Sequence, residues 1–105
     1  FDDRIAPTLE SLKAGDGGAF KDRIDVPAGR QFSGFDGYKQ AVDSGADLVI
    51  LATSPGFRPL HFAYAVEKNK HVFMEKPHAV DATGARQVIE TAKQAKAKGL
   101  GVCGG

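Results

Sequence analysis

The sequence predicts an α/β fold with a parallel sheet. A strand is expected at 47–52, because its residues 48–52 form an unbroken apolar run, which is typical of a strand covered on both faces. Two further strands are expected at 71–75, around the apolar residues 72–74, and at 100–103, and segments with helical periodicity separate the three strands. Because the connections between them are short, the pattern indicates right-handed β-α-β units.

The composition excludes several classes of protein. A chain of 105 residues forms at most one small domain, and 42% hydrophobic residues suffice for a core. Its 14 basic and 13 acidic residues are spread out, so no basic stripe indicates nucleic acid. The longest apolar run, 48–52, is too short to span a bilayer. We therefore expect no nucleic-acid partner and no membrane partner.

The amino terminus leaves the compartment open. The chain starts at Phe1 rather than at a methionine, and no signal peptide is visible. We expect that the native amino end is missing. We assign the protein to the cytoplasm, with export remaining an alternative.

The cysteine and histidine residues indicate neither a disulfide nor a metal site. Cys103 is the single cysteine, so no internal disulfide can form. It lies in the run 100–103, which predicts a buried and inert thiol. His61, His71 and His78 lack the close pairing of zinc ligands. We expect no metal.

A helix is expected at the start of the chain. Ile5, Leu9 and Leu12 form one apolar face over residues 3–13, and the glycine-rich segment 15–18 ends the helix. Because these glycines follow a helix rather than a strand, an ordinary loop is a better interpretation than a phosphate loop.

The next segment is less regular. Residues 19–30 show no clear pattern, and a short strand is expected at Gln31–Phe32. A short helix is expected at Tyr38–Ser44, after the turn at 34–37.

Two helices separate the three apolar runs. Pro59 suits the first turn of a helix that extends to about Lys68, and Asn69 can close it in the left-handed conformation. Asp81 is expected to cap the longest helix, over 82–98. An apolar stripe marks one face of that helix: Ala85, Val88, Ile89, Ala92 and Ala95. Gly99 is expected to end it.

The sequence Glu75-Lys76-Pro77 is the strongest functional signal. It follows the apolar residues 72–74 directly, and ligands of parallel α/β folds bind where strands end. Pro77 fixes its own φ and keeps Lys76 out of the helical region; the bond between them can also be cis. A solvated turn after an ordinary strand is the alternative interpretation.

Three pieces of the sequence together match one known family. The first is the strand 47–53 with Pro55 just after it, the second is His61, and the third is the segment 70–77. In this order and at these distances they resemble the Gfo/Idh/MocA family of NAD(P)-dependent sugar oxidoreductases.

The resemblance implies a partial doubly wound, Rossmann-like sheet. Residues 1–105 would belong to an amino-terminal NAD(P)-binding domain, truncated at both ends and lacking its first two strands and the carboxyl-terminal α/β domain. The glycine-rich pyrophosphate turn would precede Phe1, and the catalytic partner residues would follow Gly105. In isolation we expect a marginal fold with an exposed edge along 47–53, and poor NAD binding.

The resemblance also implies cofactor contacts. Thr53, Ser54 and Pro55 would lie against NAD or NADP, near its nicotinamide half. His61 would lie on the helix behind that loop, where helix packing is as good an interpretation as cofactor contact.

The second set of implied contacts follows the strand at 71–75. Glu75, Lys76 and Pro77 would border the nicotinamide ribose. Lys76 would also reach the substrate hydroxyl as the catalytic proton acceptor or relay. Glu75 could counter the charge of the lysine. His78 could line the same crevice, but an exposed loop histidine is the preferred interpretation.

The leading hypothesis is an oxidoreductase that transfers a hydride between a nicotinamide cofactor and a secondary hydroxyl of a sugar, cyclitol or related polyol. The 105 residues alone would be inactive. One alternative is an NAD-dependent glycosidase of the same fold, and another is a non-catalytic dinucleotide-binding regulator. Homo-oligomers would form, if at all, through the missing carboxyl-terminal domain.

Overall fold

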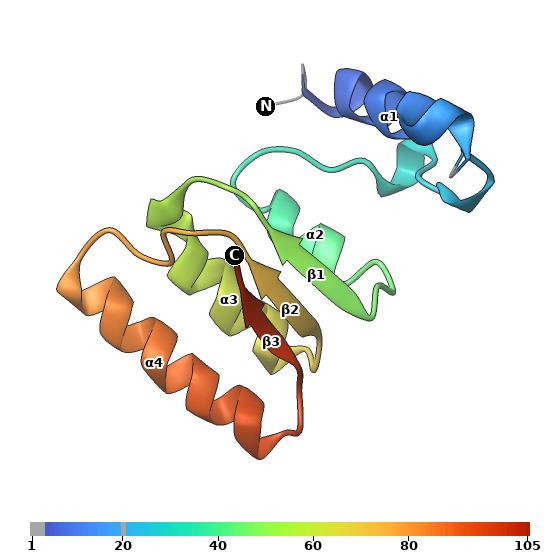
Figure 1. Ribbon diagram of the computed structural model, residues 1–105. Helices are drawn as coiled ribbons and strands as arrows, with labels where there is room; N and C mark the ends of the chain where they lie inside the picture. Colours follow the sequence, from blue (N-terminus) through green and yellow to red (C-terminus); the bar gives the residue numbers. More distant parts are fainter. Residues whose placement is uncertain (1–3, 20) are drawn as a thin grey trace. The chain divides into compact units, whose positions relative to one another are not determined.

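The computed structural model describes residues 4–19 and 21–105 (Figure 1). The chain divides into two compact units, one up to Ala41 and one from Val42 onward, and each is described here by itself. Asp3, the expected start of the first helix, lies outside the described residues, as does Phe20 in the segment expected to be irregular.

The first unit consists of short helices. The helix α1, Ile5–Ala14, confirms the helix expected near the start of the chain. Three 3-10 helices follow it: η2 (Gly15–Gly18), η3 (Lys21–Arg23) and η4 (Ala28–Arg30). The helix α2, Gly37–Val42, then leads into the second unit and confirms the expected short helix.

The strand expected at Gln31–Phe32 does not form, and that prediction is wrong. Gln31 has extended dihedral angles, with φ −105° and ψ 113°, but the segment pairs with no strand among the described residues. An extended segment becomes a strand only when a neighbour satisfies its N–H and C=O groups. Here the Gln31 N–H donates instead to the Ala28 carbonyl at 3.2 Å.

The second unit alternates strands and helices. Its elements are β1 (Leu48–Leu51), η5 (Pro55–Phe57), α3 (Arg58–Glu67), β2 (His71–Met74), α4 (Ala82–Ala97) and β3 (Val102–Gly104). The strands form one parallel sheet in the order β1-β2-β3. This arrangement confirms the predicted α/β class and the partial parallel sheet.

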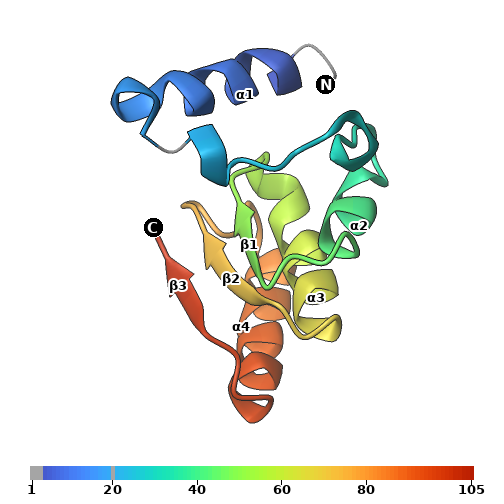
Figure 2. The same ribbon diagram turned by 90° about the vertical axis from the view of Figure 1, so that its right-hand side faces the viewer.

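Helices α3 and α4 pack on one face of this sheet (Figure 2). Side chains alternate between the two faces of a strand, so Leu51 and its paired residue Met74 share the face that is buried against the helices. From α3, Phe62 and Val66 are fully buried, and Ala95 comes from α4. Burial of each large apolar side chain stabilises the unit by about 1.5–3 kcal/mol.

No element of the second unit covers the other face of the sheet. Leu48 and Ile50 are 53% and 67% exposed there. The expectation that the run 47–52 is covered on both faces is therefore wrong for this structure, because α3 and α4 lie on the same side. β1 also forms an edge of the three-stranded sheet, as expected.

Cys103 was expected to be buried, and it is exposed. It pairs with Phe73, which in turn pairs with Ile50, so all three side chains share the uncovered face. The apolar character of its neighbours in sequence indicated a strand correctly but not the face on which the thiol lies.

Local signals at the helix ends are confirmed. The Asp81 side chain accepts a hydrogen bond from the Gly84 N–H at 2.6 Å and caps α4. Asn69 and Gly99 adopt φ values of 63° and 72° after α3 and α4, respectively.

Candidate functional site

The carboxyl ends of the three strands lie at one edge of the sheet, because the strands are parallel (Figure 2). We call this the carboxyl edge. The first loop, residues 52–57, follows β1, and the second loop, residues 75–81, follows β2. Since β1 and β2 are neighbours, the structure brings both loops together there. All the predicted site residues lie on them, except His61 on α3.

The second loop combines an exposed lysine with a fixed main chain. The side chain of Lys76 is exposed. The Glu75 N–H donates to the Leu51 carbonyl at 3.0 Å, and the Lys76 N–H donates to Oε1 of Glu75 at 3.0 Å. The Lys76–Pro77 peptide bond is cis. The ammonium group therefore extends toward solvent from a backbone that is held in place.

Arg58 also holds this loop, and the sequence reasoning missed it. Its side chain is 4% exposed, and Nη1 donates to the carbonyl oxygens of Glu75 and Pro77, the latter at 2.6 Å. In sequence, an arginine in the first turn of a helix looks like an ordinary solvated residue. The one signal against that interpretation is the helix dipole, which disfavours a cation at this end.

The first loop is held by a contact between two side chains, Thr53 of the loop and His61 of α3. Thr53 and Ser54 are exposed, and Pro55 begins η5. Thr53 Oγ1 lies 3.2 Å from Nδ1 of His61, which is 8% exposed. The His61 ring stacks on Phe57, with 5.9 Å between the ring centroids.

His61 thus packs α3 against the first loop, which agrees with one of its two sequence interpretations. Direct contact with a cofactor stays a prediction. Burial lowers the pKa of His61 below its usual value, because the charged imidazolium loses its hydration inside the protein. Burial therefore favours the neutral ring, which has one nitrogen that donates and one that accepts a hydrogen bond.

The end of β3 packs closely against the second loop. A Cβ on Gly105 would lie 2.9 Å from Cζ of Phe73 and 3.1 Å from the Glu75 carboxylate oxygens. A Cβ on Gly104 would lie 3.0 Å from the His78 ring. His78 is half-buried and its Nε2 is buried without a hydrogen-bond partner, so its expected exposure is wrong.

Gly99, Gly101 and Gly104 match the G-x-G-x-x-G spacing of dinucleotide loops. The segment runs from the end of α4 into β3, whereas a dinucleotide loop runs from a strand into a helix. The Gly101 N–H is also already used, since it donates to Nδ1 of His71 at 2.9 Å. The match does not indicate a pyrophosphate site.

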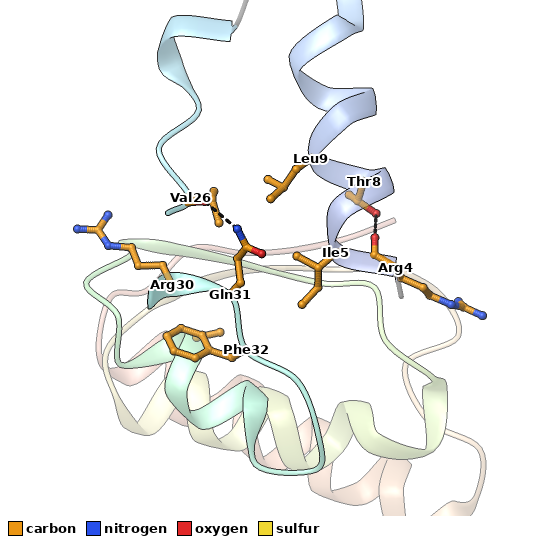
Figure 3. Close-up of a pocket in the computed structure, with 9 residues that line it drawn as sticks. Arg4, Ile5, Thr8, Leu9, Val26, Arg30, Gln31 and Phe32 are labelled. Carbon is orange, nitrogen blue, oxygen red and sulfur yellow. Dashed lines mark hydrogen bonds between the residues drawn. The ribbon is translucent and has the colours of Figure 1, made fainter. Parts of the chain in front are cut away.

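A separate pocket of about 350 Å³ lies within the first unit (Figure 3). Ile5 and Leu9 of α1 line it together with Val26 and Phe32, and Arg30 lies at its margin. None of the predicted site residues lines this pocket.

Two further findings bear on chemistry and location. Across residues 4–19 and 21–105, no group of three His, Cys, Asp or Glu side chains is placed to hold a metal ion. In the same ranges, no helix is both long and apolar enough to cross a membrane.

The sequence profile of an oxidoreductase family with an NAD-binding Rossmann fold matches residues 17–102. The chain belongs to this Gfo/Idh/MocA family. The match includes both loops of the carboxyl edge and confirms the resemblance seen in the sequence. Among curated proteins, none matches the chain.

Several solved structures of oxidoreductases are similar to this chain. An oxidoreductase structure from Bacteroides fragilis is 26% identical, with a TM-score of 0.58, and the match covers 65% of this chain and 20% of that one. An NAD-binding oxidoreductase from Klebsiella pneumoniae is 25% identical, with a TM-score of 0.57, and 70% and 19% are covered. A third, from Parabacteroides merdae, is 15% identical and matches in fold, with a TM-score of 0.73 over 97% of this chain and 22% of that one.

This Gfo/Idh/MocA chain spans about a fifth of the length of each of these proteins. Its fold class and its membership of an NAD-binding oxidoreductase family are confirmed. The roles of the predicted site residues stay predictions: Thr53, Ser54, Pro55, His61, Glu75, Lys76 and Pro77.

Proposed function

We propose that the chain is the part of a longer oxidoreductase that holds the nicotinamide end of NAD or NADP. The substrate would be a sugar, cyclitol or related polyol, oxidised or reduced at a secondary hydroxyl. One observation carries the proposal: at the carboxyl edge, Lys76 is exposed while hydrogen bonds hold the main chain on both sides of it.

The residues at this edge fit the nicotinamide half of the cofactor. Thr53 and Ser54 present exposed hydroxyl groups on the first loop, and Glu75 presents a half-buried carboxylate on the second. Such groups can hydrogen-bond the ribose hydroxyls and the carboxamide. Within residues 4–19 and 21–105, no G-x-G-x-x-G turn leads from a strand into a helix, which is the arrangement that would hold the pyrophosphate.

Lys76 has the chemistry that the reaction needs. The bound nicotinamide supplies hydride transfer. Oxidation of a secondary alcohol also releases the hydroxyl proton, and an unprotonated Lys76 Nζ can accept it. In the opposite direction, the protonated Nζ donates a hydrogen bond to the carbonyl oxygen and returns the proton. Proton transfer by a positioned side chain contributes about 10²–10⁴-fold to a rate.

Glu75 supports this role in two ways. Its Oε1 accepts the Lys76 N–H, so the carboxylate lies beside the base of the lysine side chain. Its negative charge can also offset the ammonium charge when the lysine is protonated. A carboxylate that accepts one hydrogen bond still has lone pairs for a ribose hydroxyl.

The test uses the full-length protein with a panel of sugars and polyols and either NAD or NADP. Formation of the reduced cofactor is measured by absorbance. We expect net reduction with at least one polyol, and we expect K76M to lower kcat by about 10²–10⁴-fold. K93M, at an exposed position on α4, is the matched control and should keep the wild-type rate.

Two outcomes would contradict the proposal. If K76M keeps the wild-type kcat, Lys76 does not transfer the proton. If the protein consumes a glycoside without net formation of reduced cofactor, the glycosidase alternative replaces the oxidoreductase.

A further inference from the structure

Arg58 lies in an unusual environment for an arginine. It is 4% exposed, and none of the carboxylates in the described ranges pairs with it. Its partners are two main-chain carbonyl oxygens, those of Glu75 and Pro77, and both bonds come from Nη1. Its Nε is buried and has no hydrogen-bond partner.

Two costs oppose this placement. Removing a cation from water is unfavourable unless an anion or a full set of hydrogen bonds replaces the hydration, and here Nε remains unpaired. Arg58 is also the first residue of α3, where the positive end of the helix dipole disfavours a cation. Departures of this kind from ordinary stability rules are expected at functional sites.

The hydrogen bonds of Arg58 fix the main chain on both sides of Lys76. The two carbonyls that Arg58 contacts belong to the residues immediately before and after that lysine. Hydrogen bonds from an ionised donor are stronger than neutral ones, so one guanidinium fixes both sides of the lysine. Lys76 has a long, flexible side chain, so the position of its Nζ depends on how firmly this base is held.

We propose that Arg58 is a positioning residue of the active site, which holds the second loop so that Lys76 reaches the reacting hydroxyl. This inference rests on the proposed role of Lys76. Because α3 begins directly after the first loop, Arg58 also joins the two loops of the carboxyl edge. A displacement of about 1 Å in a catalytic group can reduce a rate by about 10²-fold.

The test compares R58M, R58K and R86M in the full-length protein. Arg86 is an exposed arginine on α4, so R86M controls for the loss of an arginine. We expect R58M to lower kcat by about 10- to 100-fold with a smaller change in the KM for the cofactor. R58K should recover part of the loss, since an ammonium can still donate to a carbonyl, and R86M should match the wild type.

A double-mutant cycle separates positioning from a general structural effect. If Arg58 acts through Lys76, then R58M has no further effect in the K76M background. If R58M lowers kcat by the same factor with and without Lys76, the positioning role is overturned. If K76M is slow and R58M keeps the wild-type kcat, the inference fails while the proposed function stands. If K76M itself is fast, the proposed function fails.

Hydrogen exchange measured by mass spectrometry tests the loop directly and does not depend on turnover. We expect R58K to increase exchange within residues 75–81 and to leave α4 unchanged. This variant retains a cation, so it also serves where R58M fails to fold. Unchanged exchange in the second loop of R58K would overturn the inference.

Discussion

The two loops of the carboxyl edge are both held by α3, but by different kinds of contact. His61 holds the first loop through the Thr53 hydroxyl, a neutral hydrogen bond between side chains. Arg58 holds the second loop through two main-chain carbonyls, with a donor that stays charged. The anchor of the first loop therefore depends on the loop residue and on pH, whereas the anchor of the second loop depends on neither.

Because the two loops are held by different contacts, they differ in which side chains stay available for a ligand. Anchoring through the main chain leaves the side chain of Lys76 uncommitted, which a catalytic group requires. In the first loop the Thr53 hydroxyl contacts His61, so part of its hydrogen-bonding capacity is not available to a ligand. Four predictions test this comparison, in order of decreasing effect.

The largest effect should come from weakening the support that the two loops share. Phe62 of α3 is fully buried and directly follows His61 on the helix that holds both loops. F62A should reduce the free energy of unfolding by about 3–5 kcal/mol, because it removes apolar contacts and leaves a cavity. Urea unfolding of the full-length protein measures this, and L60A, at a residue 51% exposed on the same helix, is the control.

If F62A were no worse than L60A, α3 would not be the common support of the two loops.

The second effect is a pH dependence that belongs to the first loop alone. Burial places the folded pKa of His61 below its unfolded value of 6.5. Above that unfolded value both states are neutral, and the stability is fully present. As the pH falls below it, the unfolded chain binds a proton that the folded chain does not, so stability is lost toward the folded pKa.

The slope from this one residue should reach at most about 1.4 kcal/mol per pH unit. The slope is measured by urea unfolding of the wild type and of H61N between about pH 7 and pH 5, a range that brackets the usual histidine pKa. H61N should remove this component. R86M, at an exposed position on α4, should retain it. An identical pH slope in H61N would refute the assignment to His61.

The third effect concerns the hydrogen bond of the first loop. T53V keeps the shape of the side chain and removes the hydroxyl that lies 3.2 Å from His61 Nδ1. It should reduce stability by about 0.5–1.5 kcal/mol, the usual net value of one neutral hydrogen bond. T53S, which retains the hydroxyl, is the control.

The second loop should be unaffected by T53V. Hydrogen exchange in residues 75–81 that rises as much as in residues 52–57 would show that the two anchors are not independent.

The smallest effect is expected from Glu75. E75Q retains an oxygen that can accept the Lys76 N–H, so the free energy of unfolding should change by less than about 0.5 kcal/mol. Its effect on kcat should be larger than its effect on stability if the carboxylate charge supports Lys76. A loss of stability without a change in kcat would assign Glu75 a purely structural role.

Much of the second unit was predictable because its signals are local. Apolar runs marked all three strands, and the Asp81 cap and the left-handed Asn69 depend on residues close in sequence. The expected strand at Gln31–Phe32 failed for the opposite reason, since a strand exists only when a second segment pairs with it. Periodicity also could not tell that the run 47–52 would be covered on one face only.

The family, the alternation of strands and helices from β1 to β3, and the position of Lys76 two residues after the end of β2 could all be predicted from the amino-acid sequence. Only the tertiary structure decided that Arg58, 17 residues before Glu75, would hold the lysine loop, and that His61 would hold Thr53. It also decided that Cys103 would be exposed. The physical reason is that hydrophobic periodicity acts over a few residues, whereas burial and hydrogen-bond partners depend on which distant segments the packed sheet and helices bring into contact.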